Sequence, residues 1–365
     1  MTTLVRRALA SSILGACSLA LALAGCGGGG SGPTDPTATP IGTGTGTPGP
    51  GPTATKVPGT GTSAVKAGEV VFVSSPSETG VGELYKTLGS GTGSGRAQIT
   101  GLGKVINNPS VSTGGERIVF QFNDTPTDAN ANLELGLINT NGSGYRALTA
   151  DSTTAGRPND YSPFFSPDGN FIYWTSTRQV PDADQQPHIW RMSGQQGSTG
   201  RDQTQVTAER SAYPSVSNNG TLAYFALDKG STPIAIARVG SDGVSTVTRY
   251  VGTSFGADET VLSVALSPNG NLVAYSVGTG RALDSRAGIS IYNTTTGALE
   301  RTIPTLKGDA HARAWSRDSQ TLYFDSITTS GSGSRQIFST TVPAGGGGQV
   351  TTEPNYNYSP ALLPG

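Results

Sequence analysis

Tyr161–Trp174 reads YSPFFSPDGNFIYW, a short apolar run, a Pro-Asp-Gly turn and a second apolar run. Four weaker copies follow the same pattern: PSVSTGGERIVF from Pro109, PSVSNNGTLAYF from Pro214, VALSPNGNLVAY from Val264 and RAWSRDSQTLYF from Arg313. The turn positions of the five copies are Gly115, Gly169, Gly220, Gly270 and Ser319, which are 54, 51, 50 and 49 residues apart. A regular period of this size indicates a solenoid, a propeller or another repeat array.

Each copy is predicted to contain four strands. In the copy around Gly169 these are PFFS, FIYWTS, HIWRMS and TQVTAE, and the turn GQQGSTG joins the last two. The rest of the repeat region alternates β-rich runs with Gly, Asn and Asp turns and shows no sustained helical periodicity. A four-stranded antiparallel sheet repeated about an axis is a propeller blade, so the sequence predicts an all-β fold.

The two ends of the repeat region complete the blade count. The last residues, YSPALLPG (358–365), match the opening of the unit, and GEVVFVS (68–74) matches the segment after its turn. We therefore expect the C-terminal segment to supply the innermost strand of the blade whose other strands lie within 69–101. This arrangement closes a six-bladed β-propeller and removes a free sheet edge.

Two residue types in the repeat are expected to be structural. The pairs Asp168-Gly169 and Asn269-Gly270 are turn formers, and such turns require positive φ. The three tryptophans, Trp174, Trp190 and Trp315, fall at strand positions and are predicted to lie in the core.

The pattern S-P-D-G-x-x-I-x-[FYW], followed by a strand such as HIWRM and a closing [VIL]-T, resembles the WD40-like (PD40) repeat of TolB-type six-bladed propellers. The resemblance covers essentially all of residues 68–365. Two departures stand out. A linker replaces the N-terminal α/β domain of TolB, so the partner contacts of TolB cannot be carried over. The fourth and fifth copies lack the leading proline and have Val264 and Arg313 there.

Residues 1–25 have the features of a secretory signal peptide. Arg6 and Arg7 precede an apolar run that contains no acidic residue. The run ends in Leu23-Ala24-Gly25-Cys26, which resembles the bacterial lipobox and implies lipidation of Cys26. An uncleaved membrane anchor is the alternative. The sequence thus predicts a chain exported and lipid-anchored to the bacterial cell membrane or outer membrane.

Residues 26–67 are predicted to be a spacer between that anchor and the propeller domain at 68–365. This segment consists almost entirely of Gly, Pro and Thr, which cannot bury enough surface to fold. The only cysteines are Cys17 and Cys26, so a disulfide framework in the repeat region is excluded. Outside the signal peptide the chain has 22 basic and 25 acidic residues, and this balance disfavours nucleic-acid binding.

The sequence shows no recognisable catalytic or metal-binding motif. The two histidines, His188 and His311, lack metal-ligand spacing, and we expect His188 at the surface or at a sheet edge. Residues 252–256 match G-x-S-x-G but lack the strand–helix context of a nucleophile elbow. Oxygen ligands for calcium occur in two loops, at Asp124, Asp128 and Asn130 and at Asp182 and Asp184, without EF-hand spacing. We therefore predict no cofactor, no metal and no catalytic residues.

Enzymes that contain related propellers need machinery that has no counterpart in this sequence. Prolyl oligopeptidases require an additional α/β-hydrolase domain, and oligogalacturonate lyases require a histidine cluster. Neither enzyme class is therefore indicated by the resemblance.

On the propeller template, one face carries the entrance to the central channel. The residues expected around that entrance are Asn107, Asn108, Tyr161, Ser162, Tyr213, His311 and Tyr358. Long loops on the same face, 122–132, 175–187 and 277–287, would add Asp124, Arg178, Asp182, Asp184, Arg281, Asp284 and Arg286. Tyrosine and arginine are favoured anchors in binding sites. The alternative for the three tyrosines is that they pack around the channel without touching a ligand.

These features favour a monomeric, non-catalytic module that recognises a protein or glycan at the cell envelope. Two alternatives remain: an enzyme that processes carbohydrate or peptide at the channel mouth, and a structural envelope component. A low density of titratable side chains facing the channel would favour the binding module.

Overall fold

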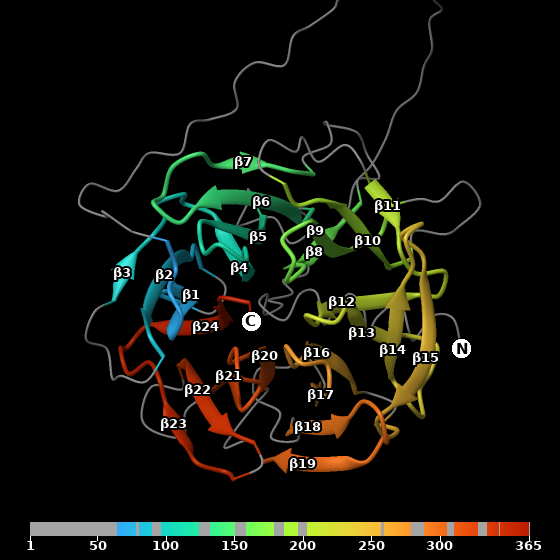
Figure 1. Ribbon diagram of the computed structural model, residues 1–365. Helices are drawn as coiled ribbons and strands as arrows, with labels where there is room; N and C mark the ends of the chain where they lie inside the picture. Colours follow the sequence, from blue (N-terminus) through green and yellow to red (C-terminus); the bar gives the residue numbers. More distant parts are fainter. Residues whose placement is uncertain are drawn as a thin grey trace, which may run out of the picture.

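The computed structural model describes residues 64–77, 80–89, 96–123, 132–149, 158–178, 186–195, 203–256, 259–278, 288–304, 310–327, 334–342 and 344–364. These residues form six four-stranded sheets and no helix, arranged as blades around a central axis (Figure 1). The predicted six-bladed all-β propeller is therefore confirmed. The inner strands of the blades are largely buried on both faces, as in β13, where all six residues are buried. The inner strands are therefore more continuously apolar than those of a half-exposed sheet. Outermost strands such as β23 are exposed.

Blades 1 to 3 are named here by chain order, innermost strand first. Blade 1 contains β24 (Tyr356–Leu362), β1 (Glu69–Ser75), β2 (Glu83–Leu88) and β3 (Ala97–Gln98). Blade 2 contains β4 (Val105–Val111), β5 (Arg117–Asn123), β6 (Glu134–Asn139) and β7 (Arg146–Ala147). Blade 3 contains β8 (Asp160–Phe165), β9 (Phe171–Ser176), β10 (His188–Ser193) and β11 (Gln203–Gln205).

Blades 4 to 6 continue the ring in the same way. Blade 4 contains β12 (Ser211–Val216), β13 (Thr221–Ala226), β14 (Ile234–Val239) and β15 (Ser245–Val251). Blade 5 contains β16 (Thr260–Leu266), β17 (Leu272–Gly278), β18 (Gly288–Asn293) and β19 (Leu299–Ile303). Blade 6 contains β20 (His311–Trp315), β21 (Thr321–Ile327), β22 (Arg335–Thr341) and β23 (Gly347–Gln349).

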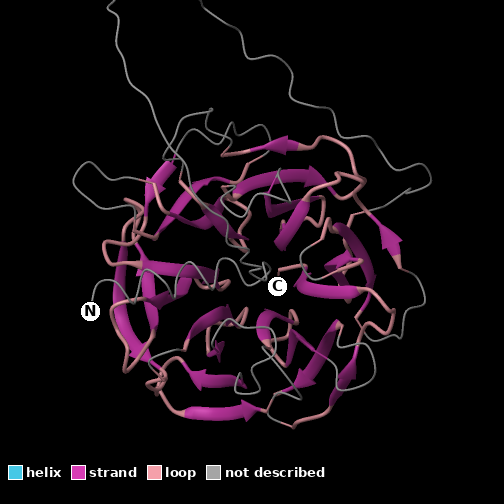
Figure 2. Cartoon of the chain, turned by 180° about the vertical axis from the view of Figure 1, so that it is seen from behind, coloured by secondary structure: helices cyan, strands magenta, loops and turns pink. Residues whose placement is uncertain are grey.

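The ring closes between the two ends of the chain, as the sequence predicts. Strand β24 pairs antiparallel with β1, with Val70 opposite Leu362 and Ser74 opposite Asn357. The C-terminal strand therefore completes blade 1 at the centre of the molecule (Figures 1 and 2).

A serine and an Asx residue fix the turn between the first two strands in four of the blades. In blade 3 the Ser166 hydroxyl donates to Asp168 Oδ1 over 2.5 Å. Ser217 and Asn219, Ser267 and Asn269, and Ser316 and Asp318 make the same bond. The next residue has positive φ in every copy, including 72° at Gly169 and 61° at Ser319, so the predicted backbone requirement is confirmed.

The described part of the propeller begins at Ala64, before the start at 68 expected from the sequence. Val65 is 2 % exposed within the core cluster of blades 1 and 2, and its N–H donates to the Gly115 carbonyl over 2.7 Å. A single valine next to the Gly/Pro/Thr segment carried no visible periodicity. It lies in the core because the Gly115 turn leaves room for its backbone.

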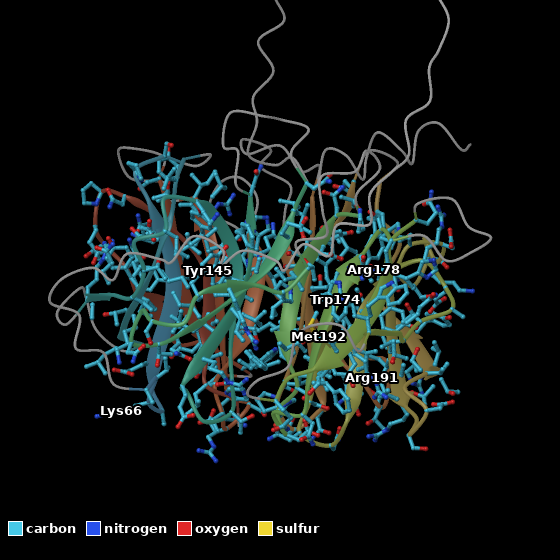
Figure 3. All side chains as sticks on the ribbon, turned by 90° about the horizontal axis from the view of Figure 1, so that it is seen from above. Lys66, Tyr145, Trp174, Arg178, Arg191 and Met192 are labelled. Carbon is cyan, nitrogen blue, oxygen red and sulfur yellow. The ribbon has the colours of Figure 1, made fainter. Side chains whose placement is uncertain are left out.

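The two faces of the ring differ in what they carry. The mouth face holds the first residues of the innermost strands, such as Tyr161 and His311, and the turn face holds the turns at Gly115 and Gly169. Figure 3 shows Arg178, just after β9, on one face and Lys66, just before β1, on the other. The chain therefore enters the propeller on its turn face.

Candidate functional site

The innermost strands of all six blades surround a central cavity of about 110 Å³. One layer of its wall is formed by the residues at the leading-proline position of the repeat, one from each blade. The residues there are Pro109, Pro163, Pro214, Val264, Arg313 and Pro360. Among the described residues that line the cavity, Arg313 carries the only charged side chain. The wall is thus a ring of small apolar groups with one guanidinium.

A β-bulge shapes the mouth of the cavity in the four blades that keep the proline. The residue before each proline has positive φ: 47° at Asn108, 51° at Ser162, 59° at Tyr213 and 52° at Ser359. Two residues of the innermost strand then oppose one of its neighbour, as Ser162 and Pro163 do in blade 3. Blades 5 and 6, which have lost the proline, show a one-residue shift and no positive φ within the innermost strand.

Side chains of the preceding blade stabilise these unusual backbone positions. The N–H of Ser162 donates to Gln121 Oε1 over 3.1 Å, and that of Tyr213 donates to Thr175 Oγ1 over 3.0 Å. The N–H of Ser359 donates to Asp325 Oδ2 over 3.0 Å. The three acceptors come from the second strand of the neighbouring blade, so the mouth is held together across blade boundaries.

Asp325 is the centre of a buried polar cluster behind the mouth. Its Oδ1 accepts from Arg335 Nη1 at 2.8 Å and from His311 Nδ1 at 2.9 Å. Its Oδ2 accepts from Arg313 Nε at 2.8 Å in addition to the Ser359 N–H. The Asp325 side chain is fully buried, whereas those of Arg335, Arg313 and His311 are 6 %, 15 % and 18 % exposed. A buried carboxylate with four donors is fully satisfied.

The cluster has defined charges at neutral pH. Burial alone would raise the pKa of Asp325, but the charge of Arg313, the contact with His311 and the charge of Arg335 together hold it well below its usual range. Burial and the charge of Arg313 lower the pKa of His311 to about 4, against the opposing effect of Asp325. Asp325 is therefore ionised and His311 neutral. Because a carboxylate only accepts, the Nδ1 atom of His311 carries the proton.

Arg313 connects this cluster to the far side of the mouth. Its Nη1 donates to Asn108 Oδ1 over 2.6 Å, from blade 6 to blade 2. The Asn108 amide nitrogen donates to Gln121 Oε1 over 2.9 Å and to Ser162 Oγ over 3.2 Å. Asn107 Oδ1 accepts from the Asn108 N–H and from the Ser359 hydroxyl. A continuous hydrogen-bonded network thus spans blades 6, 1, 2 and 3.

Comparison with known proteins identifies the architecture. No family model and no curated protein matches the chain. Among solved structures, TolB from Acinetobacter baumannii aligns with a TM-score of 0.59 at 15 % identity, over 82 % of this chain and 67 % of that one. The fold is TolB-like.

Two further solved structures share this architecture. A putative TolB from Agrobacterium tumefaciens aligns with a TM-score of 0.52 at 12 % identity, over 80 % of this chain and 92 % of that one. A chain of a nidogen/laminin complex aligns with a TM-score of 0.53 at 9 % identity, over 80 % and 97 %. At these identities the likeness concerns the fold of the TolB-like propeller alone.

The TolB-like propeller brings together five of the seven residues predicted at the mouth. Asn107, Asn108, Ser162 and His311 belong to the polar network, and Tyr213 lines the cavity beside Asn108 and Ser162.

Tyr161 and Tyr358 lie in the core instead, at 3 % and 6 % exposure. The Tyr161 ring packs edge-on against Tyr213 at 6.2 Å, and the Tyr358 hydroxyl donates to the Ile106 carbonyl over 3.4 Å. For these two tyrosines the packing alternative holds.

Sequence reasoning missed five residues of the network: Gln121, Arg313, Asp325, Arg335 and Ser359. Arg313 was visible as a departure from the proline pattern, but the pattern did not tell where its side chain points. Asp325 and Arg335 lie on β21 and β22, the second and third strands of blade 6. An aspartate inside the otherwise uncharged strand TLYFDSI was the available signal, because buried carboxylates need charged partners.

The other candidates fall elsewhere in the TolB-like propeller. His188 is 7 % exposed and its Nδ1 lies 3.3 Å from the Thr207 carbonyl, so the surface or edge prediction is wrong. Residues 207–211 cover this end of β10 and remove it from the edge. Strand β11 ends at Gln205, earlier than predicted, because the N–H groups of Val206 and Thr207 both donate to the Ile189 carbonyl, over 2.7 and 3.4 Å, which breaks the regular pairing with β10.

The tryptophans follow the prediction in two of three cases. Trp174 and Trp315 are buried, with 0 % and 5 % exposure. Trp190 is only half-buried and carries the Arg178 guanidinium 5.4 Å from its ring centroid. Arg178 also bonds Asp160 Oδ2 over 2.7 Å, which ties the predicted rim residue to its own blade.

The G-x-S-x-G match lacks the context of a nucleophile elbow in the described residues. The G-x-S-x-G segment at 252–256 follows β15 as coil, and no helix follows it in the described chain. Groups of three or more possible metal-ligating side chains are absent from the part of the chain that the structure describes.

Several predicted positions lie outside the described residues: the signal peptide, Cys26, most of the linker, and the loop residues Asp124, Asp128, Asn130, Asp182, Asp184, Arg281, Asp284 and Arg286. Within the described residues, the structure contains no helix long and apolar enough to cross a membrane.

Proposed function

We propose that this chain is a bacterial lipoprotein whose TolB-like propeller recognises a protein or glycan at the cell envelope through the mouth of its central cavity. The observation that carries the proposal is the character of the cavity wall. Prolines and other apolar residues alternate there with serine and asparagine side chains and one guanidinium. Such a concave wall, apolar with polar groups placed within it, is the composition expected of a binding pocket.

The point at which the chain enters the propeller is compatible with the same proposal. Val65 is fixed at the Gly115 turn, so the segment that leads to Cys26 joins the turn face. The tether would therefore leave the mouth face, with its polar network, unobstructed.

A catalytic role for His311 and Asp325 is the second candidate, because their contact of 2.9 Å resembles an orienting acid–base pair. The flanking arginines weigh against it. A histidine whose pKa is about 4 is a poor general base near neutral pH. Binding is therefore the function that the geometry supports better.

Replacing Cys26 by serine is expected to release the protein from the membrane. With wild-type Cys26, two or three acyl chains would anchor the chain stably, since a single chain gives only marginal binding. The measurement is the share of protein in the membrane fraction, together with the mass of the mature N-terminal peptide. Membrane retention of Cys26→Ser with an intact N-terminus would instead indicate an uncleaved anchor.

Recognition at the mouth is tested by capture from an envelope extract of the source bacterium, using the full-length protein in detergent as bait. The variant Tyr213→Ala removes a ring that lines the cavity and is expected to lower capture of a specific protein or glycan at least tenfold. Arg238→Ala, an exposed residue on the turn face, is the matched control and should capture like the wild type. Equal capture by both variants would move recognition away from the mouth, and no capture by the wild type would favour the enzymatic and structural alternatives.

A further inference from the structure

Among the described residues, the guanidinium of Arg313 has one edge without an anionic partner. Its Nε–H is bonded to Asp325, and its Nη1 is bonded to the neutral amide oxygen of Asn108. Its Nη2 lies 3.0 Å from His311 Nδ1. That nitrogen carries the proton given to Asp325, so it cannot accept from Arg313. The Nη1–Nη2 edge is thus matched only by a neutral oxygen.

The counter-charge of Arg313 is shared. The carboxylate of Asp325 bonds Arg313 through Oδ2 and Arg335 through Oδ1, and His311 is neutral. Asp325 therefore offsets the charge of Arg313 only in part. Of the two arginines, only Arg313 lines the cavity, and the other described lining residues carry no charge. The charge of Arg313 therefore faces the interior of the central cavity.

The amide oxygen of Asn108 occupies the position beside Arg313 that an oxygen of a bound anion would take. Its amide oxygen lies 2.6 Å from Nη1, while its backbone has a φ of 47°. A non-glycine residue keeps this conformation only where its surroundings fix it. Ser162 Oγ, 3.2 Å from the Asn108 amide, adds a hydroxyl on the same side of the cavity. A planar carboxylate in place of the amide oxygen would form a charge-assisted, bidentate pair with Arg313, which is stronger than the neutral bond it replaces.

We propose that the mouth of the cavity binds a carboxylate group in the place of the Asn108 amide oxygen, with Arg313 as its charged partner and the Ser162 hydroxyl as a neutral one. The inference rests on the proposed function and names the chemical class of its ligand. The carboxylate could belong to an acidic peptide side chain or to a sugar acid. Both sources share the chemistry that Arg313 recognises.

The test uses the full-length protein in detergent at low salt and compares matched probes by equilibrium titration. The probes are N-acetyl-aspartate amide against N-acetyl-asparagine amide, and glucuronate against glucose. The wild type should bind at least one carboxylate tenfold or more tightly than its neutral counterpart, and raising the salt concentration should reduce this preference. The pair with the larger ratio identifies the source of the carboxylate.

Two variants locate the effect. Arg313→Gln should abolish the preference for the carboxylate, and Arg238→Gln, on the opposite face, should keep it. Arg313→Lys keeps the charge without the planar fork, so it should retain part of the preference. The melting curve of Arg313→Gln, compared with that of the wild type, shows whether a loss in this variant reflects misfolding. Equal affinity of the wild type for charged and neutral probes, or an unchanged preference in a folded Arg313→Gln, would overturn the proposal.

The outcome is separable from that of the proposed function. Capture that depends on Tyr213 but not on Arg313 would support recognition at the mouth and contradict the carboxylate proposal. A preference for the carboxylate without any capture would support the carboxylate site and contradict the recognition of a protein or glycan.

Discussion

A chain that lacks residues 358–365 is expected to lose the cooperative fold of the whole ring, not only one strand. Tyr358 and Ala361 are 6 % and 5 % exposed, and β24 is hydrogen-bonded along β1. The deletion also removes the hydrogen bond from the Ser359 N–H to Asp325 and so destabilises blade 6 as well. We expect a loss of more than about 5 kcal/mol, comparable to the total stability of many domains. Urea unfolding followed by circular dichroism measures it.

A shorter deletion provides the matched control. Removal of residues 364–365 leaves β24 complete and should change the unfolding midpoint little. A synthetic peptide that spans residues 354–365 should restore part of the stability of the long deletion. Unfolding of the long deletion at the same midpoint as the full chain would contradict closure through β24.

Asp325→Asn is expected to destabilise the propeller by about 3–5 kcal/mol, because it takes the counter-charge of Asp325 away from the buried guanidiniums of Arg313 and Arg335. The measurement is the free energy of unfolding at pH 7. Asp228→Asn is the control, since the Arg210–Asp228 pair is 30 % and 47 % exposed. An exposed pair contributes about 1 kcal/mol or less. Similar losses in the two variants would show that the Asp325 cluster does not hold the blades together.

The same cluster predicts how stability depends on pH. The pKa of folded Asp325 lies well below the unfolded value, so its contribution is present above pH ~4 and is lost as the pH falls through the folded pKa. His311 has a pKa of about 4 in the folded protein and ~6.5 in the unfolded chain. Between these two pH values only the unfolded chain binds the proton, which favours unfolding as the pH falls. Stability should therefore already decline below pH 6.5, and Asp325→Asn should weaken the part of the decline seen below pH 4.

The repeat unit was sufficient to predict the blades because its information is local. A serine, an Asx residue and a glycine within four positions determine the turn, and the apolar runs on either side become the two inner strands. This holds even at Ser319, where the glycine is missing and the backbone still has a φ of 61°. The match between residues 358–365 and the opening of the unit was equally local, and it predicted the closure of the ring.

The candidate site could be predicted only in part because it depends on contacts between distant segments. Arg313 and Asn108 are 205 positions apart and meet only after the ring has closed. Tyr161 and Tyr358 occupy the same place in the repeat beside a bulge, and the direction of a side chain next to a bulge is not visible in the sequence. His188 was misplaced for a related reason, since residues 207–211 cover it from another part of the blade.

The most direct test of recognition at the mouth is site-specific photo-crosslinking in living cells. A photoreactive amino acid would replace Tyr213 at the cavity in one protein and Asp242, in the exposed turn between β14 and β15 on the turn face, in another. The proposed function predicts a discrete crosslinked partner from position 213 and none from position 242. A partner that crosslinks from position 242 alone would contradict recognition through the mouth of the propeller.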